Sequence, residues 1–419
     1  MKQQRAIFTI ISINYINFAN VLAKSLIESH TKLRLICFIS DITEKEWNDM
    51  NIEDTIYFDP MFVNNNMVND LSNRAMKYNI TEFNTSIKPG IILYLSIKYD
   101  KIIYLDPDIY VFGDLQYVFQ LLDMYNIIIT PHITQPINDS YSPNEINFLR
   151  VGTYNLGFIA IKCNDETNRM LSWWSSRLSD FCYNATQEGL FTDQKWIDLV
   201  PSLFGGVYIL KNPGYNVAYW NLHYRYLEKL GSGYYVNKLP LIFFHFSGFN
   251  VSQIFTISKY QDRMNMALRP DVNEIYLEYA KHLLNYSVKF DKQTDYRFGF
   301  FNNGKPVSDL TRQLYSCLLQ QGTIESSDDP FDNNGEFYAQ AGTLGFLTNE
   351  NNYSVKEYSG TLIKIDDMLS KKYKRQHSAF KLLMKLAFKL LGTQRYLALM
   401  KYLNHVSMPT KSAIFLHDK

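Results

Sequence analysis

Two aspartates and one histidine have the residue types and positions of a metal site. Asp106 and Asp108 flank a proline directly after the apolar run 102–105, and His245 ends another apolar run. Carboxylates and an imidazole suit Mn²⁺, or Mg²⁺, better than a soft metal. Such an ion can bridge a diphosphate and neutralise charge on a leaving group. The alternative is structural, because aspartates at this spacing are common in turns and a histidine among phenylalanines is often part of the core.

The apolar runs around these residues predict the elements that position them. The run 102–105 lacks polar alternation, as is typical of a parallel strand covered on both faces, and ligands bind at the carboxyl ends of such strands. Helical patterns, including one continuous helix over 81–99, alternate with further strand-like runs. These runs lie at 7–13, 33–40, 154–162 and 239–245. The alternation predicts an α/β fold with a mostly parallel sheet flanked by helices.

Length and composition limit the class of protein. With 419 residues, of which 46% are hydrophobic, the chain is long enough for one large domain with an appendage or for two domains. Its formal net charge of +1 argues against a nucleic-acid partner. The four cysteines show no metal-binding spacing, and no apolar run approaches the roughly 20 residues of a membrane span. We therefore expect a cytoplasmic protein that is soluble or peripheral.

The segment around the aspartates has a family resemblance. The stretch "YLDPDIYVFGDL" closely resembles the D-x-D segment of GT-A fold glycosyltransferases, most of all glycosyltransferase family 8. Three further segments match in the right order: "YNLGFIAIK" looks like the Asn-x-Gly strand of the family, "FTDQKWID" like its Asp-Gln segment, and "FFHFSGF" like its terminal histidine motif. The resemblance covers roughly residues 7 to 250, and the order of the motifs makes it specific.

The resemblance implies a GT-A, Rossmann-like fold with a helical C-terminal extension, and transfer of a sugar from a nucleotide-sugar, expected to be a UDP-sugar. It implies that Asp106, Asp108 and His245 hold Mn²⁺ (or Mg²⁺), which binds the diphosphate. Asp193 and Gln194 are the implied catalytic pair, facing the donor sugar near the reacting carbon. The other implied donor-binding residues are Ile11, Ser12, Asn14 and Tyr15 at the nucleobase, Lys88 beside the donor, and Asn155 and Gly157 on the sugar or acceptor side.

The family pattern is incomplete after the histidine. Family members usually continue into Lys-Pro-Trp, whose lysine neutralises the diphosphate, but "HFSGFNVSQIF" contains neither lysine nor tryptophan. The candidate replacements are Lys88, Arg225 and Lys259, although Lys88 is almost as well explained as a solvated residue at a helix end. The departure suggests a divergent bacterial relative.

The stretch "NPGYNVAYWNLHYR" is unusually rich in aromatic and amide side chains. Aromatic faces stack on sugar rings, and amides offer paired donors and acceptors. Asn216 and Trp220, together with Tyr215 and Asn221, are therefore candidates for the donor-sugar or acceptor pocket. A well-packed core turn is the equal alternative.

The chain divides into a predicted catalytic domain over 1–260, a helical and loop-rich accessory region over 261–365, and a basic tail over 366–419. In the tail, one helical face carries Lys381, Lys385 and Lys389, and another carries Phe380, Leu383, Met384, Ala387, Leu390 and Leu391. A basic amphipathic helix can lie on an anionic membrane. The alternative is a helix packed on the catalytic domain. Attachment to the inner membrane would bring the enzyme to a glycan or lipid-linked acceptor, as in synthesis of lipopolysaccharide or another surface polysaccharide.

Three alternatives concern the activity itself. The resemblance implies retention of anomeric configuration, whereas an inverting enzyme needs a base, for which Asp193 is the candidate. A non-catalytic glycan- or nucleotide-binding protein with the same fold is the alternative function, and the complete set of Asp106, Asp108 and His245 argues against it. Phosphoryl transfer through the aspartates is disfavoured because "DPDIYVFG" contains no Ser or Thr.

Overall fold

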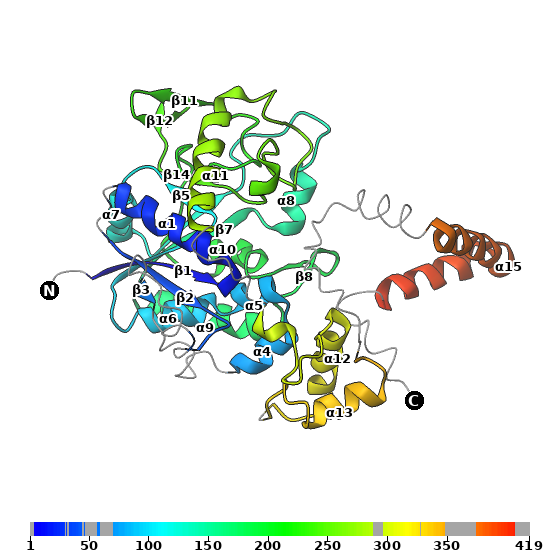
Figure 1. Cartoon of the computed structure of the whole chain (residues 1–419). Helices are drawn as coiled ribbons and strands as arrows, with labels where there is room; N and C mark the ends of the chain where they lie inside the picture. Colours follow the sequence, from blue (N-terminus) through cyan, green and yellow to red (C-terminus); the bar gives the residue numbers. More distant parts are fainter. Residues whose placement is uncertain are drawn as a thin grey trace.

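The computed structural model describes residues 4–29, 31, 33–43, 46, 57–58, 70–287, 296–326, 328–347 and 374–406. Among them, seven strands form a central sheet in the order β10, β6, β7, β4, β1, β2, β3 (Figure 1). These strands are β1 Arg5–Ile11, β2 Leu35–Ile39, β3 Tyr57–Phe58, β4 Lys101–Leu105, β6 Ile127–Pro131, β7 Tyr154–Lys162 and β10 Val207–Ile209. Strand β7 is antiparallel to β4 and β6, and the other pairings are parallel. The predicted α/β class with a mostly parallel sheet is confirmed.

The surroundings of β4 explain why its sequence is apolar throughout, without alternating polar residues. Ile102 and Tyr104 belong to one buried hydrophobic cluster, and Ile103 and Leu105 belong to another. Both faces of the strand are therefore covered, and every position favours an apolar side chain. Among the helices that contribute to the first cluster are α4 Leu71–Lys77, α5 Ile80–Ser86, α6 Lys88–Leu95 and α9 Asp165–Asp180, and the second cluster includes residues of α1 Ile16–Glu28 and α7 Gln116–Met124.

The single helix expected over 81–99 is wrong, because two helices, α5 and α6, meet at Ile87. Pro89 lies in the first turn of α6 and has no backbone N–H to continue the hydrogen-bond ladder of α5. Asn79 caps the start of α5, since its side chain accepts from the N–H groups of Thr81 and Glu82. The break places Lys88 at the start of α6, where its side chain is buried.

The apolar run that ends at His245 lies outside the central sheet. Strand β14 Phe243–His245 pairs antiparallel with β5 Ile109–Val111 to form a separate two-stranded sheet. The remaining strands form two further small sheets, β8 Asn184–Ala185 with β9 Leu190–Phe191, and β11 Leu227–Leu230 with β12 Gly233–Val236 and β13 Leu239–Pro240. The pairing of β5 with β14 is what brings distant parts of the sequence to one site.

The remaining described α-helices are α8 Glu145–Val151, α10 Val200–Leu203, α11 Asn273–Ser287, α12 Asp309–Gln320, α13 Glu336–Thr343 and α15 Lys374–Val406. Tyr276 and Tyr279 of α11 share a hydrophobic cluster with Phe244 and Phe246. Arg312 of α12 donates to the carbonyl oxygen of Ala75 at 2.6 Å. The helical C-terminal extension is thus confirmed. The buried core continues across residue 260, and the division into regions 1–260, 261–365 and 366–419 stays a prediction.

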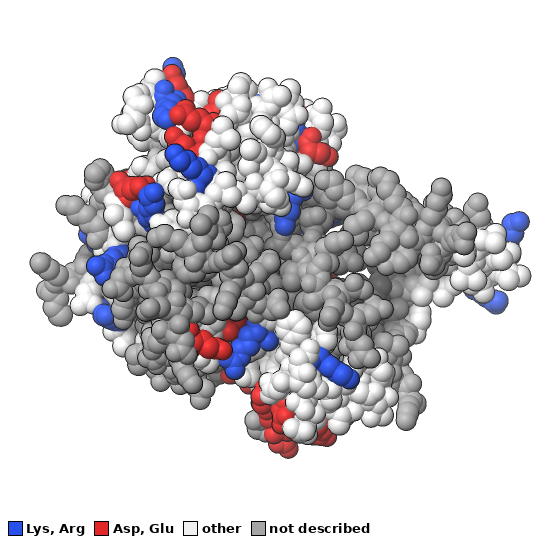
Figure 2. Space-filling model, viewed as in Figure 1, with Lys and Arg blue, Asp and Glu red and all other residues white. Residues whose placement is uncertain are grey.

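Two surface properties are relevant to partners. None of the helices in the described part of the chain is both long and apolar enough to cross a membrane. On the face drawn in Figure 2, the acidic and basic side chains of the described residues are dispersed among neutral ones.

Candidate active site at the D-x-D segment

The backbone around β4 and β5 explains how Asp106, Asp108 and His245 come together. Strand β4 ends at Leu105, and the N–H of Asp106 then donates to the carbonyl oxygen of Gly157 at 2.8 Å. In the register of β5 and β14, Ile109 lies opposite His245. The N–H of Phe246 donates to the carbonyl oxygen of Asp108 at 2.9 Å, which extends this pairing. The turn between β4 and β5 therefore faces the end of β14.

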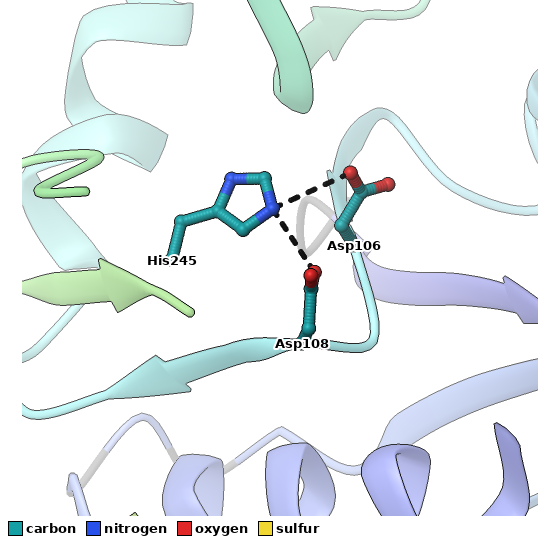
Figure 3. Close-up of side chains that lie close together, drawn as sticks. All are labelled: Asp106, Asp108 and His245. Carbon is teal, nitrogen blue, oxygen red and sulfur yellow. Dashed lines mark ion pairs between the residues drawn. The ribbon is translucent and has the colours of Figure 1, made fainter. Parts of the chain in front are cut away.

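The three side chains point toward one another (Figure 3). His245 Nε2 lies 3.0 Å from Asp108 Oδ1 and 3.7 Å from Asp106 Oδ2. One ligand atom from each residue lies within 4.8 Å of the others. The imidazole is buried while both carboxylates are partly exposed, so the carboxylates face the accessible side. Two carboxylate oxygens and one imidazole nitrogen are a donor set that fits Mn²⁺ or Mg²⁺.

The electrostatics of the three residues favour a cation. Burial lowers the pKa of His245, but Asp108 and Asp106 raise it by more, so the net pKa is raised. Burial raises the pKa of Asp106, against the opposing effects of Lys88 and His245, and its net pKa is also raised. The two shifts have different causes, because the neighbouring carboxylates raise the pKa of His245, whereas burial is the largest cause of the raised pKa of Asp106. Additional positive charge at this place would stabilise the carboxylates.

Gly157 leaves the space in which His245 lies. A Cβ at this position would be 2.4 Å from His245 Cε1, 2.7 Å from His245 Nδ1 and 2.9 Å from Asn155 Oδ1. No real Cβ makes contacts this close, so a side chain here would displace the imidazole. The structure thus gives Gly157 a role in positioning a proposed ligand.

A buried ion pair lies beside this cluster. Lys88 Nζ donates to Asp193 Oδ2 at 2.6 Å and to the carbonyl oxygen of Leu156 at 3.0 Å. It also lies 4.0 Å from the centre of the Tyr104 ring. The hydroxyl of Tyr104 donates to Asp106 Oδ1 at 2.6 Å. Lys88 is 1% exposed, so it is not the solvated helix-end residue of the alternative interpretation. Tyr104 was missed in the sequence, although it shares a strand face with Asp106.

Amide side chains connect three of the predicted residues. Gln194 Oε1 accepts from Leu156 N at 3.1 Å and from Asn155 Nδ2 at 3.3 Å. Asn216 Nδ2 donates to Asn155 Oδ1 at 3.0 Å. His132 was not predicted, yet its Nε2 lies 3.5 Å from Asn155 Nδ2, and its position after β6 is the signal that would have found it. The structure thus brings Asn155, Gln194 and Asn216 together.

In the stretch 212–225, some residues fit the interpretation as a sugar or acceptor pocket, and others fit the interpretation as a packed core turn. The indole of Trp220 lies 5.2 Å from the His245 ring at an angle of 87°, so it forms a wall beside the proposed ligand. The side-chain oxygen of Asn216 and the indole nitrogen of Trp220 are buried and have no hydrogen-bond partner among the described residues. Asn221 is fully buried and donates to the carbonyl oxygens of His132 and Asn216, and Tyr215 packs in the core. Asn221 and Tyr215 therefore belong to the core turn.

The residues predicted at the nucleobase lie at the carboxyl end of β1, which is parallel to β4 in the sheet. Ile11 and Ser12 are buried, whereas Asn14 and Tyr15 are exposed, and Tyr15 stacks on Phe18 at 5.0 Å. Ser12 Oγ accepts from Asn84 Nδ2 at 2.8 Å. Asp41, which was not predicted, accepts from the N–H of Ile13 at 2.8 Å. The four predicted residues thus share an edge of the sheet with the D-x-D turn.

Comparisons with known proteins define the class. The model of the glycosyl transferase family 8 matches residues 6–231, more than half of the chain. The chain therefore belongs to glycosyl transferase family 8. The predicted family and the predicted enzyme class, a glycosyltransferase, are confirmed.

Two uncharacterized proteins of Bacillus subtilis (strain 168) are similar to this chain. The first, YfnF, is 29% identical over 206 residues, which are 48% of this chain and 67% of YfnF. YfnD is 29% identical over 176 residues, 41% of this chain and just over half, 54%, of YfnD.

Solved structures show likeness at the level of the fold. The galactosyltransferase LgtC, solved with donor and acceptor sugar analogs, is 17% identical with a TM-score of 0.43, over 68% of this chain and 99% of LgtC. The glycosyltransferase GlyE of Streptococcus pneumoniae TIGR4 is 16% identical with a TM-score of 0.39, over 72% of this chain and 67% of GlyE. Likeness of this degree carries no argument about substrates. The acidic cluster and the family membership agree with dependence on a divalent metal.

Proposed function

We propose that the chain transfers a sugar from a UDP-sugar to a glycan or lipid-linked acceptor in bacterial surface polysaccharide synthesis, with retention of configuration and with Mn²⁺ or Mg²⁺. The observation that carries the proposal is the approach of Asp106, Asp108 and His245, whose ligand atoms lie within 4.8 Å of one another. The family membership supports the donor class, and the matched residues 6–231 include the two aspartates. The acceptor and the pathway rest on the resemblance and on the tail.

In this proposal Asp106, Asp108 and His245 hold the ion, and Tyr104 and Gly157 position them. The ion would supply charge stabilisation for the departing nucleoside diphosphate. Gln194, Asn155 and Asn216 form an amide wall that can hydrogen-bond hydroxyls of the donor sugar, and the unpartnered oxygen of Asn216 is an acceptor for one of them. Ile11, Ser12, Asn14 and Tyr15 bind the nucleobase at the neighbouring strand end.

The state of Asp193 supports retention over inversion. A general base must accept the proton of an acceptor hydroxyl within hydrogen-bond reach. Asp193 is 2% exposed, and its Oδ2 holds the Lys88 ammonium at 2.6 Å. To act as a base it would have to give up this ion pair, so it is better suited to binding the donor sugar than to deprotonating an acceptor. NMR of the anomeric proton in the product tests this, and an inverted product would overturn it.

Thermal unfolding with a panel of nucleoside diphosphates tests the donor site. Each ligand is added with Mn²⁺ or with EDTA to the wild type, to Asp108→Asn and to Asp114→Asn. Asp114 is the matched control, because it is an exposed aspartate whose Oδ1 accepts one N–H bond that asparagine can keep. UDP at about 100 times its dissociation constant should stabilise the wild type and Asp114→Asn by about 2.7 kcal/mol.

The same experiment separates the alternatives. We expect no stabilisation by UDP in EDTA or in Asp108→Asn. If no nucleotide stabilises the wild type, the donor site is wrong and a non-catalytic glycan-binding protein becomes the better proposal. If stabilisation persists in Asp108→Asn, the nucleotide binds without the proposed metal ligands.

The tail supports a peripheral location on the cytoplasmic side of the inner membrane. Helix α15 extends away from the body of the protein, with basic side chains at its tip (Figures 1 and 2). Gly392 interrupts it with a φ of 74°. The side chains of Phe380, Lys381 and Lys385 lie outside the described residues, and Lys389 is exposed. The exposed apolar side chains of this helix are Leu382, Leu383, Leu386, Phe388, Leu390, Leu391, Leu397, Met400, Tyr402 and Leu403.

Their exposure favours the membrane interface over packing against the catalytic domain, because a packed helix buries such residues. Truncation after Asp367 should abolish sedimentation with vesicles of anionic lipid, while binding of UDP remains. High salt should weaken sedimentation of the full chain. Unchanged sedimentation of the truncated chain would contradict the membrane role of the tail without affecting the proposed reaction.

A further inference from the structure

The two aspartates of the D-x-D segment have different partners in the structure. The hydroxyl of Tyr104 donates to Asp106 Oδ1 at 2.6 Å, which fixes this carboxylate from the side of β4. Asp108 pairs with another proposed metal ligand, because its Oδ1 lies 3.0 Å from His245 Nε2 (Figure 3). Carboxylates that bind metal ions are themselves held by hydrogen bonds from outside the ligand set. A loaded site would therefore need such a donor for Asp108 as well.

Binding of a cation by His245 would remove its hydrogen bond to Asp108. The imidazole must carry a proton on Nε2 to donate to this carboxylate, whereas a nitrogen that ligates a metal ion offers its lone pair and carries no proton. Nε2 is the imidazole nitrogen that faces both aspartates, so the same atom would serve in both roles (Figure 3). Loss of the proton leaves Asp108 as a partly buried carboxylate that another hydrogen bond would stabilise.

Tyr279 of helix α11 has a buried hydroxyl close to this turn. The residue is 1% exposed, and its hydroxyl oxygen has no hydrogen-bond partner among the residues that the structure describes. Its ring stacks on Phe246 with 3.8 Å between the ring centres, and it lies 6.3 Å from the ring of Tyr110 at an angle of 89°. Phe246 directly follows His245, and its N–H donates to the carbonyl oxygen of Asp108 at 2.9 Å. Tyr110 lies two residues after Asp108 on β5. The ring is thus held between the two segments that carry the proposed ligands.

The groups around the Tyr279 hydroxyl show the direction in which it points. Burial is the largest cause that raises the pKa of Tyr279 well above its usual value, and the charge of Asp108 is the next cause. Tyr276 lies about one helical turn earlier in α11 and is equally buried. After burial, the groups that shift the pKa of Tyr276 are Arg269 and Tyr219. The two phenols therefore have different surroundings, and the phenol of Tyr279 faces the D-x-D turn.

A buried hydroxyl without a partner is unfavourable for the fold. Most buried polar groups in folded proteins form a hydrogen bond, because an unsatisfied one has lost its contacts with water and gained nothing in return. A phenylalanine would fill the same space between Phe246 and Tyr110 without this loss. The hydroxyl of Tyr279 is therefore best explained by a partner that it gains in another state of the site.

We propose that Tyr279 is a positioning residue, whose hydroxyl donates to Asp108 when His245 Nε2 holds a divalent cation. The phenol would then support Asp108 as Tyr104 supports Asp106 in the structure. Helix α11 lies outside residues 6–231, which match the family model, so the part of the chain after them contributes to the site. The inference rests on the proposed function, because it assumes that a cation binds at the three proposed ligands.

The test uses Tyr279→Phe in the full chain, because this change removes the hydroxyl and keeps the ring. In EDTA, its melting temperature should equal or exceed that of the wild type, since the hydroxyl has no described partner to lose. Its affinity for Mn²⁺, measured by titration followed by electron paramagnetic resonance, should fall by about 10- to 100-fold, the range for loss of a group that supports a metal ligand. Tyr276→Phe is the matched control and should keep the Mn²⁺ affinity of the wild type, because its phenol has other neighbours.

The outcomes distinguish this inference from the function on which it rests. If Asp108→Asn loses Mn²⁺ while Tyr279→Phe binds it like Tyr276→Phe, the hydroxyl does not support Asp108 and the metal site still holds. If Tyr279→Phe melts at a lower temperature than the wild type in EDTA, the hydroxyl already has a partner without the cation, and the inference is wrong. If the wild type binds no Mn²⁺, both proposals are overturned.

Discussion

Replacing Gly157 with alanine should damage the metal site without changing any of its ligands. The added Cβ would lie 2.4 Å from His245 Cε1, whereas ordinary contacts begin at 3.4 Å. The imidazole must therefore move by about 1 Å, far more than the roughly 0.2 Å that metal–ligand distances tolerate. The wall formed by Trp220 on the histidine limits where the ring can go.

We expect two measurable effects of Gly157→Ala. Overpacking should lower the free energy of unfolding by about 1–3 kcal/mol. Affinity for Mn²⁺ should fall by about 10- to 100-fold, as it does when a ligand loses its support. Denaturant unfolding and Mn²⁺ titration followed by electron paramagnetic resonance measure these effects separately.

Gly205→Ala is the control for Gly157→Ala. A Cβ at Gly205 meets no atom closer than Glu166 Oε1 at 3.6 Å, so alanine fits there. Gly205→Ala should keep the Mn²⁺ affinity and the stability of the wild type. If Gly157→Ala binds Mn²⁺ as tightly as Gly205→Ala does, the argument that Gly157 positions a ligand is refuted.

Three further changes test other parts of the structure. Lys88→Met should lower the free energy of unfolding by about 3–5 kcal/mol, because it leaves Asp193 buried without its counter-charge. Adding Asp193→Asn to the same chain should recover part of this loss. If the effects of the two substitutions on the free energy of unfolding simply add in a double-mutant cycle, the ion pair does not contribute to stability. Burial lowers the pKa of His132 to about 4. As the pH drops below 6.5, this imidazole therefore takes up a proton in the unfolded chain while it stays neutral in the folded chain. The free energy of unfolding should fall by about 3 kcal/mol between pH 6.5 and pH 4. Denaturant midpoints across this range should flatten in His132→Gln, and an unchanged slope would assign the effect to another group. Arg312→Ala should cost about 2–3 kcal/mol, because the buried carbonyl oxygens of Ala75 and Phe298 lose their donor, and an unchanged midpoint would show that this contact does not hold α12 in place.

The sequence predicted the class of fold and the place of the two aspartates at the end of β4, because both have local signals. The apolar run of β4 and the two aspartates after it are contiguous, so strand and site are adjacent in the chain. Tyr104 also had a signal, since residues two apart on a strand share a face. The pair of Lys88 and Asp193 had none, because the two residues are 105 positions apart and meet only in the folded protein.

The position of His245 depends on the register of the two three-residue strands β5 and β14, and the amino-acid composition does not determine this register. Phe243 packs in one hydrophobic cluster and Phe244 in another, and their partners Val111 and Tyr110 divide in the same way. A slip by one residue would exchange these faces and turn the imidazole away from Asp108. The apolar residues on either side of this short ladder therefore do more than fill the core. They specify the register in which His245 Nε2 lies 3.0 Å from Asp108 Oδ1.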